Sequence, residues 1–224
     1  LADLQGGLEG LMREPGGCFE QTSTSNYPNI MILGYLKASD AVKPELAQRA
    51  KGMLDRGYAK LIAFECPDSA DKAKHGFEWF GQMDQQHQAL TAYGLLQFKD
   101  LDRAYPGKVD PELIKRTQQY LLSQQTPNKD GFKRNARALD SFGRAPDAIT
   151  NAYIAWALAE SDPDDKEGMA DLLKQLDGLK KQAKDNNDPY FLALVANALL
   201  HRPTGGNREE ALAILDRIVE KNLK

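Results

Sequence analysis

Two kinds of helical segment alternate along this chain, and the alternation limits the possible folds more than any other feature. Apolar residues recur at helical spacing almost throughout, whereas alternating apolar and polar runs long enough for a strand are hard to find. One kind of segment is rich in alanine and glycine and apolar nearly all round: residues 27–38, 88–98, 148–159 and 189–200. A helix that is apolar on every side must be buried on every side.

The second kind of segment is amphipathic, with one charged face. It covers residues 42–64, 111–124, 166–184 and 207–224. These helices can lie between solvent and the buried set. An inner ring of buried helices wrapped by an outer ring satisfies both patterns, so the sequence predicts an all-α fold, an α/α toroid.

A weak internal repeat supports stacked helix pairs. Residues 89–93 read ALTAY and residues 148–153 read AITNAY, each within a buried segment. The longest irregular stretches, 66–86 and 126–145, both precede inner helices and contain glycines. If the inner helices run parallel, their N-termini and these loops gather at one face, where we expect the functional site.

Composition excludes several classes of protein. The 224 residues are 42% hydrophobic and 27% charged, which indicates one folded domain over 1–224, and 29 basic against 32 acidic side chains favour neither nucleic acid nor an anionic membrane. Two cysteines cannot form a disulfide framework, and with three scattered histidines they lack zinc spacing, so no metal or cofactor is expected. Neither a transmembrane span nor a signal peptide is visible, and the absence of an initial Met suggests a fragment of a larger multidomain chain.

The most unusual local sequence is PGGCFEQTSTSNYP, residues 15–28, before the first inner helix. Its glycines permit a turn closed to other residues, and its Thr, Ser and Asn side chains offer capping oxygens. The positive end of a helix favours the thiolate of Cys18, which makes it both a nucleophile and a leaving group. Gln21 follows three residues later, so a tight turn can bring its amide carbonyl onto the Cys18 sulfur.

At this motif the chain resembles a known family. Residues 17–21, GCFEQ, are similar to the thioester motif of the α2-macroglobulin and complement family, which reads GCGEQ in most animal members and has a bulky apolar residue after Cys in many bacterial ones. Residues 33–36 (LGYL), 76–81 (GFEWFG), 89–93 (ALTAY) and 130–132 (DGF) extend the resemblance, closest to bacterial α2-macroglobulins, over essentially the whole chain. In that family the domain is an α/α toroid with six inner helices. We count four, which predicts a ring that is shorter or that stops short at its C-terminal side.

The resemblance implies an internal thioester between Cys18 and Gln21, formed with loss of the amide nitrogen as ammonia. A target's lysine amine or hydroxyl would attack it and become linked to Gln21, freeing the Cys18 thiol. This is covalent trapping without turnover rather than enzyme activity. The implied partners are target proteases or surface nucleophiles and the other domains of the parent macroglobulin, outside the cell or in the periplasm. Phe19, Tyr27, Trp79 and Phe80 are the candidate shields against water.

Histidines bear on the chemistry of capture. Some complement members carry a histidine in the loop before the third inner helix, but residues 133–147 contain none, with Leu139 or Asp140 nearest in position. We therefore predict direct aminolysis, with hydroxyl transfer slower by the roughly 10²- to 10⁴-fold that a positioned base supplies. His87 directly precedes an inner helix and is the candidate for a contact with the site; His75 and His201 receive no role.

Two alternatives come from other functional classes. A toroid enzyme of the prenyltransferase or terpene-cyclase type would need clustered acidic residues on the face of the inner-helix N-termini, where they are sparse. The acidic residues 162–165 (DPDD) follow the C-terminal end of an inner helix and are interpreted as a solvated loop. The other alternative is a helical-repeat interaction module without chemistry. Cys66 is interpreted as a partly buried spare thiol.

Overall fold

The structure is a computed structural model that describes residues 2–39, 44–136, 145–163, 166–203 and 205–222. Its elements, in chain order, are α1 (Ala2–Leu11), α2 (Phe19–Ala38), α3 (Pro44–Ala63), β1 (Glu65–Pro67), β2 (Lys74–Phe77), α4 (Gln88–Ala104), α5 (Pro111–Ser123), α6 (Asp147–Ser161), α7 (Lys166–Asp185), α8 (Pro189–Leu200) and α9 (Asn207–Asn222). None of these helices combines the length and the apolar content that crossing a membrane requires.

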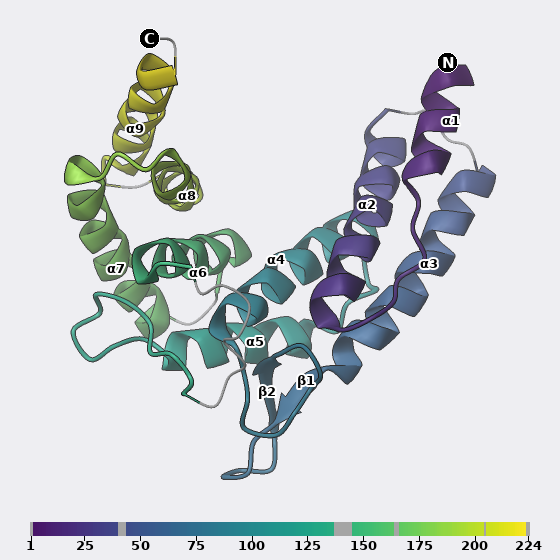
Figure 1. Ribbon diagram of the computed structural model, residues 1–224, viewed down its shortest axis with the longest axis horizontal. Coiled ribbons are helices and arrows are strands. Elements are labelled where there is room, and N and C mark those ends of the chain that lie inside the picture. Colours follow the sequence, from purple (N-terminus) through teal and green to yellow (C-terminus); the bar gives the residue numbers. More distant parts are fainter. Residues whose placement is uncertain (1, 40–43, 137–144, 164–165, 204, 223–224) are drawn as a thin grey trace.

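Inner and outer helices alternate as the sequence predicts. The inner helices α2, α4, α6 and α8 contact one another in chain order, and the amphipathic helices α3, α5, α7 and α9 pack outside them. Figure 1 shows the pairs following one another along an arc, with α1–α3 at one end and α8–α9 at the other. The prediction of a helical fold in which inner and outer helices alternate is confirmed.

An aromatic cluster joins the first inner helices to the β-hairpin. Phe19, Phe77 and Phe98 are fully buried, and the rings of Phe19 and Phe77 stack with centroids 4.9 Å apart. Burying one such side chain stabilises the fold by about 1.5–3 kcal/mol. The cluster therefore fixes the start of α2 against β2 and α4.

The first inner helix begins earlier than predicted. We expected it from residue 27, but α2 begins at Phe19 and Pro28 lies in its middle. The run of Thr, Ser and Asn that was expected to cap the helix lies inside it. Phe19 is fully buried there with its ring stacked on that of Phe77, so tertiary packing outweighs the cost of a proline inside the helix.

The stretch expected to be an irregular loop over 66–86 contains an antiparallel hairpin, in which Glu65 pairs with Phe77 and Pro67 with Lys74. Strands of three and four residues are too short to show a period of two. Cys66 lies on β1 and is fully buried, so its description as partly buried was wrong. Leu139 and Asp140 lie outside the described residues.

Candidate functional site

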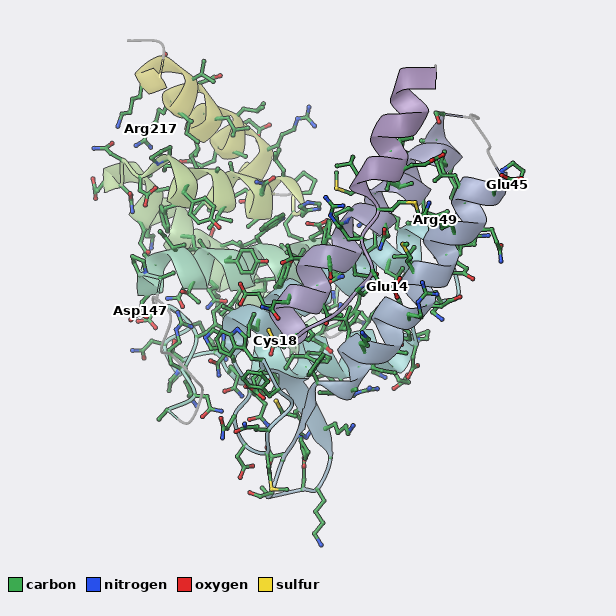
Figure 2. All side chains as sticks on the ribbon, turned by 45° about the vertical axis from the view of Figure 1, so that its right-hand side comes forward. Glu14, Cys18, Glu45, Arg49, Asp147 and Arg217 are labelled. Atoms are coloured by element: carbon green, nitrogen blue, oxygen red, sulfur yellow. The ribbon has the colours of Figure 1, made fainter. Side chains whose placement is uncertain are left out.

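Cys18 is the residue that caps the N-terminus of α2. Its backbone is extended, with φ −71° and ψ −179°, and Gly17 before it has φ +87°. Figure 2 shows Cys18 at the end of α2 where the helix meets the preceding turn.

The side chain of Gln21 folds back over Gly17 and Cys18. Its Oε1 accepts a hydrogen bond from the Cys18 N–H at 3.3 Å, and the two residues stand in the positions of a capping box. A Cβ atom at Gly17 would overlap Gln21 Oε1 and lie 2.9 Å from Gln21 Cβ. Glycine is therefore required at this position for space as well as for its positive φ.

The segment before the motif is fixed to α2 and α3. Asn29 of α2 bonds to both the N–H and the C=O of Arg13, at 3.4 and 2.9 Å. From α3, Lys60 Nζ donates to the Pro15 carbonyl at 2.8 Å. A bidentate pair, Arg56 with Glu14 at 2.6 and 2.8 Å, lies one turn earlier on α3. These contacts hold the backbone that leads into Gly17.

Trp79 lies beside the first turn of α2. Its carbonyl accepts the Phe19 N–H at 2.9 Å, and its indole Nε1 donates to Glu20 Oε2 at 2.9 Å. Its ring meets the His87 ring edge to face, with centroids 5.0 Å apart. Of the four candidate shields, Trp79 is the one that these contacts place next to Cys18.

His87 caps the N-terminus of α4. Its Nδ1 accepts the Leu90 N–H at 3.2 Å, so the neutral imidazole carries its proton on Nε2. Trp79 contacts both His87 and the first turn of α2, so His87 lies on the same face of the inner helices as Cys18. The N-termini of α2 and α4 therefore gather at one face, as the parallel inner helices predict.

The other shield candidates lie elsewhere. Phe19 is fully buried with its ring against Gly94, so it anchors the start of α2 to α4 and does not cover the Cys18 sulfur from the solvent side. Tyr27 is roughly 13 Å further along α2, from the helical rise per residue. There it stacks on Tyr93 and bonds to Asp100, and burial together with that carboxylate raises the pKa of Tyr27 well above its usual value. Phe80 follows Trp79 with 58% of its surface exposed.

The residues given no role have ordinary local partners. His75 pairs with Asp71 at 2.6 Å, and His201, at the other end of the inner helices, approaches Glu160 at 3.6 Å. Asp162, first of the acidic residues 162–165, ends α6 and pairs with Arg202 at 2.6 Å.

No role was predicted from the sequence for Glu20, Glu78, Lys60 or Asn29, which make contacts at and around the site. Glu20 lies within residues 17–21 (GCFEQ) and Glu78 within residues 76–81 (GFEWFG). Both motifs supported the family resemblance, but neither glutamate was assigned a contact. Lys60 and Asn29 carried no local signal, since their contacts reach residues 45 and 16 positions away in the chain.

Comparison with known proteins identifies related domains. The family described as the A-macroglobulin TED domain, that is the thioester-containing domain, matches residues 1–223. Thioester-containing protein 1 allele S1 of Anopheles gambiae is 23% identical over 97% of the chain and 16% of the relative. Alpha-2-macroglobulin-like protein 1 of Mus musculus is 28% identical over 68% of the chain and 10% of the relative. The chain thus spans less than a fifth of either relative.

Solved structures show the same fold. Native α2-macroglobulin from Escherichia coli, resolved from domain MG7 to the C-terminus, has a TM-score of 0.61 at 18% identity, over 92% of this chain and 30% of that one. A Salmonella α2-macroglobulin variant has a TM-score of 0.58 at 18% identity, over 93% of this chain and 12% of that one. Together with the match over residues 1–223, this places the chain in the thioester-containing domain family of the α2-macroglobulins and complement proteins.

Proposed function

We propose that Cys18 and Gln21 form an internal thioester and that this domain captures target proteins covalently through it. The observation that carries the proposal is the fold-back of the Gln21 side chain onto Gly17 and Cys18, where only glycine leaves room for it. A spacing of three residues across a helix N-cap brings the thiol and the carboxamide to the same turn.

Bond formation balances without a cofactor. The Cys18 sulfur attacks Gln21 Cδ, the C–N bond of the carboxamide breaks, and the nitrogen leaves as ammonia with the thiol proton. The Cys18 N–H already donates to Gln21 Oε1, the oxygen on which negative charge develops during attack. A preorganised donor at such an oxygen stabilises the tetrahedral intermediate, both in formation and in capture.

Capture reverses the roles of the two side chains. A lysine amine of the target attacks Gln21 Cδ, the C–S bond breaks, and the sulfur leaves as a thiol that takes the proton of the amine. Gln21 is consumed as an amide of the target, so each molecule reacts once and does not turn over. We infer that the parent protein is a protease trap or surface-defence protein that acts in the periplasm or outside the cell, with its other domains adding to the shielding.

We also propose that capture is direct aminolysis. His87 contacts Trp79 and caps α4, and its Nδ1 is engaged by the Leu90 N–H, which leaves Nε2 as a proton donor in the neutral ring. A neutral imidazole in that tautomer presents no lone pair on Nε2 for attack on the acyl carbon. Products should therefore be amides, which resist hydroxylamine; a majority of hydroxylamine-labile, ester-linked product would contradict direct aminolysis.

The test of the function is capture of an amine-bearing protein by the protein that carries this domain. Digestion and mass spectrometry should locate the new bond at Gln21, with one Cys18 thiol released for each target bound. Gln21→Glu keeps the size and shape of the side chain but offers no ammonia to lose, so it should capture nothing. If Gln21→Glu captures as well as the wild-type protein, the proposed chemistry is wrong.

A further inference from the structure

Glu78 is a buried carboxylate that the proposed chemistry does not use. Only 1% of its surface is exposed. Its Oε1 accepts two backbone hydrogen bonds, from the Phe80 N–H at 2.8 Å and from the Gln82 N–H at 2.7 Å. One carboxylate oxygen thus closes the turn over residues 78–82.

The rest of this turn is packed against the hairpin and α3. Gly81 has φ +71°, and a Cβ atom there would lie 3.0 Å from Phe64 Cα. The thiol of Cys66 is also buried near Glu78, and its pKa is raised by burial and by the charge of Glu78. Within the described part of the chain, Glu78 Oε2 is buried without a hydrogen-bond partner. Burying a carboxylate in this way is costly, so stability alone does not account for Glu78.

The turn determines where Trp79 lies. Trp79 directly follows Glu78, and the same residue binds α2 through its carbonyl, to the Phe19 N–H, and through its indole, to Glu20. Its position is therefore set from two sides, by the turn that Glu78 closes and by the first turn of the helix that Cys18 caps. If the turn loosens, Trp79 loses one of these two supports while Cys18 keeps its own backbone.

We propose that Glu78 is a positioning residue that holds Trp79 beside Cys18 and so limits access of small reagents and water to the reacting sulfur and acyl carbon. The inference rests on the proposed function for its biological meaning, because the access that matters is that of water to the thioester. The position of Trp79 affects access to Cys18 whether or not the thioester between Cys18 and Gln21 is present.

Glu65 provides a matched control. It is also a hairpin carboxylate, 3% exposed, but it pairs with Arg116 of α5 at 2.7 and 2.9 Å rather than with the turn over 78–82. Glu78→Ala and Glu65→Ala each remove one buried carboxylate of this hairpin. A merely structural role predicts similar effects of the two on Cys18, whereas positioning predicts an effect of Glu78→Ala alone.

The experiment measures alkylation of Cys18 by iodoacetamide after methylamine treatment, which leaves a free thiol with or without a prior thioester. Peptide mapping separates Cys18 from the buried Cys66. Glu78→Ala should speed alkylation about tenfold, the factor for losing a hydrogen bond to a charged group. Glu65→Ala should stay within about twofold of wild type, as expected for residues without shared partners. Glu78→Gln keeps an acceptor oxygen and should restore most of the protection.

Equal rates for Glu78→Ala and wild type, or equal acceleration by Glu65→Ala, would overturn the inference. If Glu78→Ala does not fold, Gly81→Ala strains the same turn and should accelerate alkylation in its place; an unchanged rate there overturns it as well. The second readout is the rate at which water hydrolyses the intact thioester. This rate should rank the variants in the same order as the alkylation rate of Cys18. A wild-type protein without any mass deficit would refute the proposed thioester, while the alkylation rates would still decide the role of Glu78.

Discussion

Replacing Gly17 by alanine tests whether glycine is needed here for formation of the thioester rather than for folding of the domain. The Cβ atom of alanine would overlap Gln21 Oε1 and crowd Gln21 Cβ, at 2.9 Å. The Gln21 side chain must then leave its place against Cys18. We therefore expect Gly17→Ala to abolish thioester formation completely, although both bond-forming residues are still present.

The effect on stability should be modest. Alanine at a φ of +87° costs about 1–2 kcal/mol relative to glycine. Loss of the bond from the Cys18 N–H to Gln21 Oε1 adds about 1 kcal/mol. A total of about 2–3 kcal/mol corresponds to a fall in melting temperature of about 4–12 °C for a domain of this size. The variant should therefore remain folded at room temperature while losing its chemistry.

Gly16→Ala is the control, because a Cβ atom at Gly16 makes only an ordinary contact, 3.8 Å from Lys60 Nζ. The assay is methylamine incorporation followed by mass spectrometry, with a thermal melt of the same sample. Gly16→Ala should incorporate methylamine as the wild-type protein does. If Gly17→Ala incorporates methylamine normally, or if both variants fail equally, the explanation based on the Gln21 fold-back is refuted.

Two further predictions concern the hairpin. Burial raises the pKa of Cys66 to about 12 from an ordinary 9.0, so its stabilising effect is complete below pH 9 and is lost as pH rises toward 12. Between pH 8 and 10 the free energy of unfolding in urea should fall by about 1.4 kcal/mol more in the wild-type protein than in Cys66→Ala; parallel pH profiles would disprove this. Arg116→Ala leaves the carboxylate of Glu65 buried without its bidentate partner and should lower the unfolding free energy by about 3–5 kcal/mol. Adding Glu65→Gln should recover part of that loss, and a loss below 1 kcal/mol for Arg116→Ala, the typical value of a surface ion pair, would contradict the account.

The alternation of inner and outer helices was predictable because a helix that is buried on all sides has apolar residues on all sides. An inner helix such as α8 is buried over most of its surface, and its sequence is apolar apart from Asn197. The start of α2 was not predictable by the same reasoning. Pro28 is unfavourable inside a helix, but the burial of Phe19 against Phe77 extends α2 back to Phe19.

The site divides in a similar way. The fold-back of Gln21 onto Cys18 was predictable because both residues and the preceding glycines lie within one short motif. The position of Tyr27, far along α2 and paired with Asp100, depends on where the helix begins and could not be read from its closeness to Cys18 in sequence. The contact of Trp79 with Glu20 joins residues 59 positions apart, and no local pattern encodes it.

The central claim is the bond between Cys18 and Gln21, and the mass of the intact, freshly purified protein that carries this domain tests it most directly. We expect a mass that is lower by one ammonia than the mass calculated from the sequence. Methylamine should then add its own full mass, giving the sequence mass plus one CH₂ unit, and release one titratable thiol that maps to Cys18. A mass equal to the sequence before treatment, with a thiol already free at Cys18 and no uptake of methylamine, would contradict it.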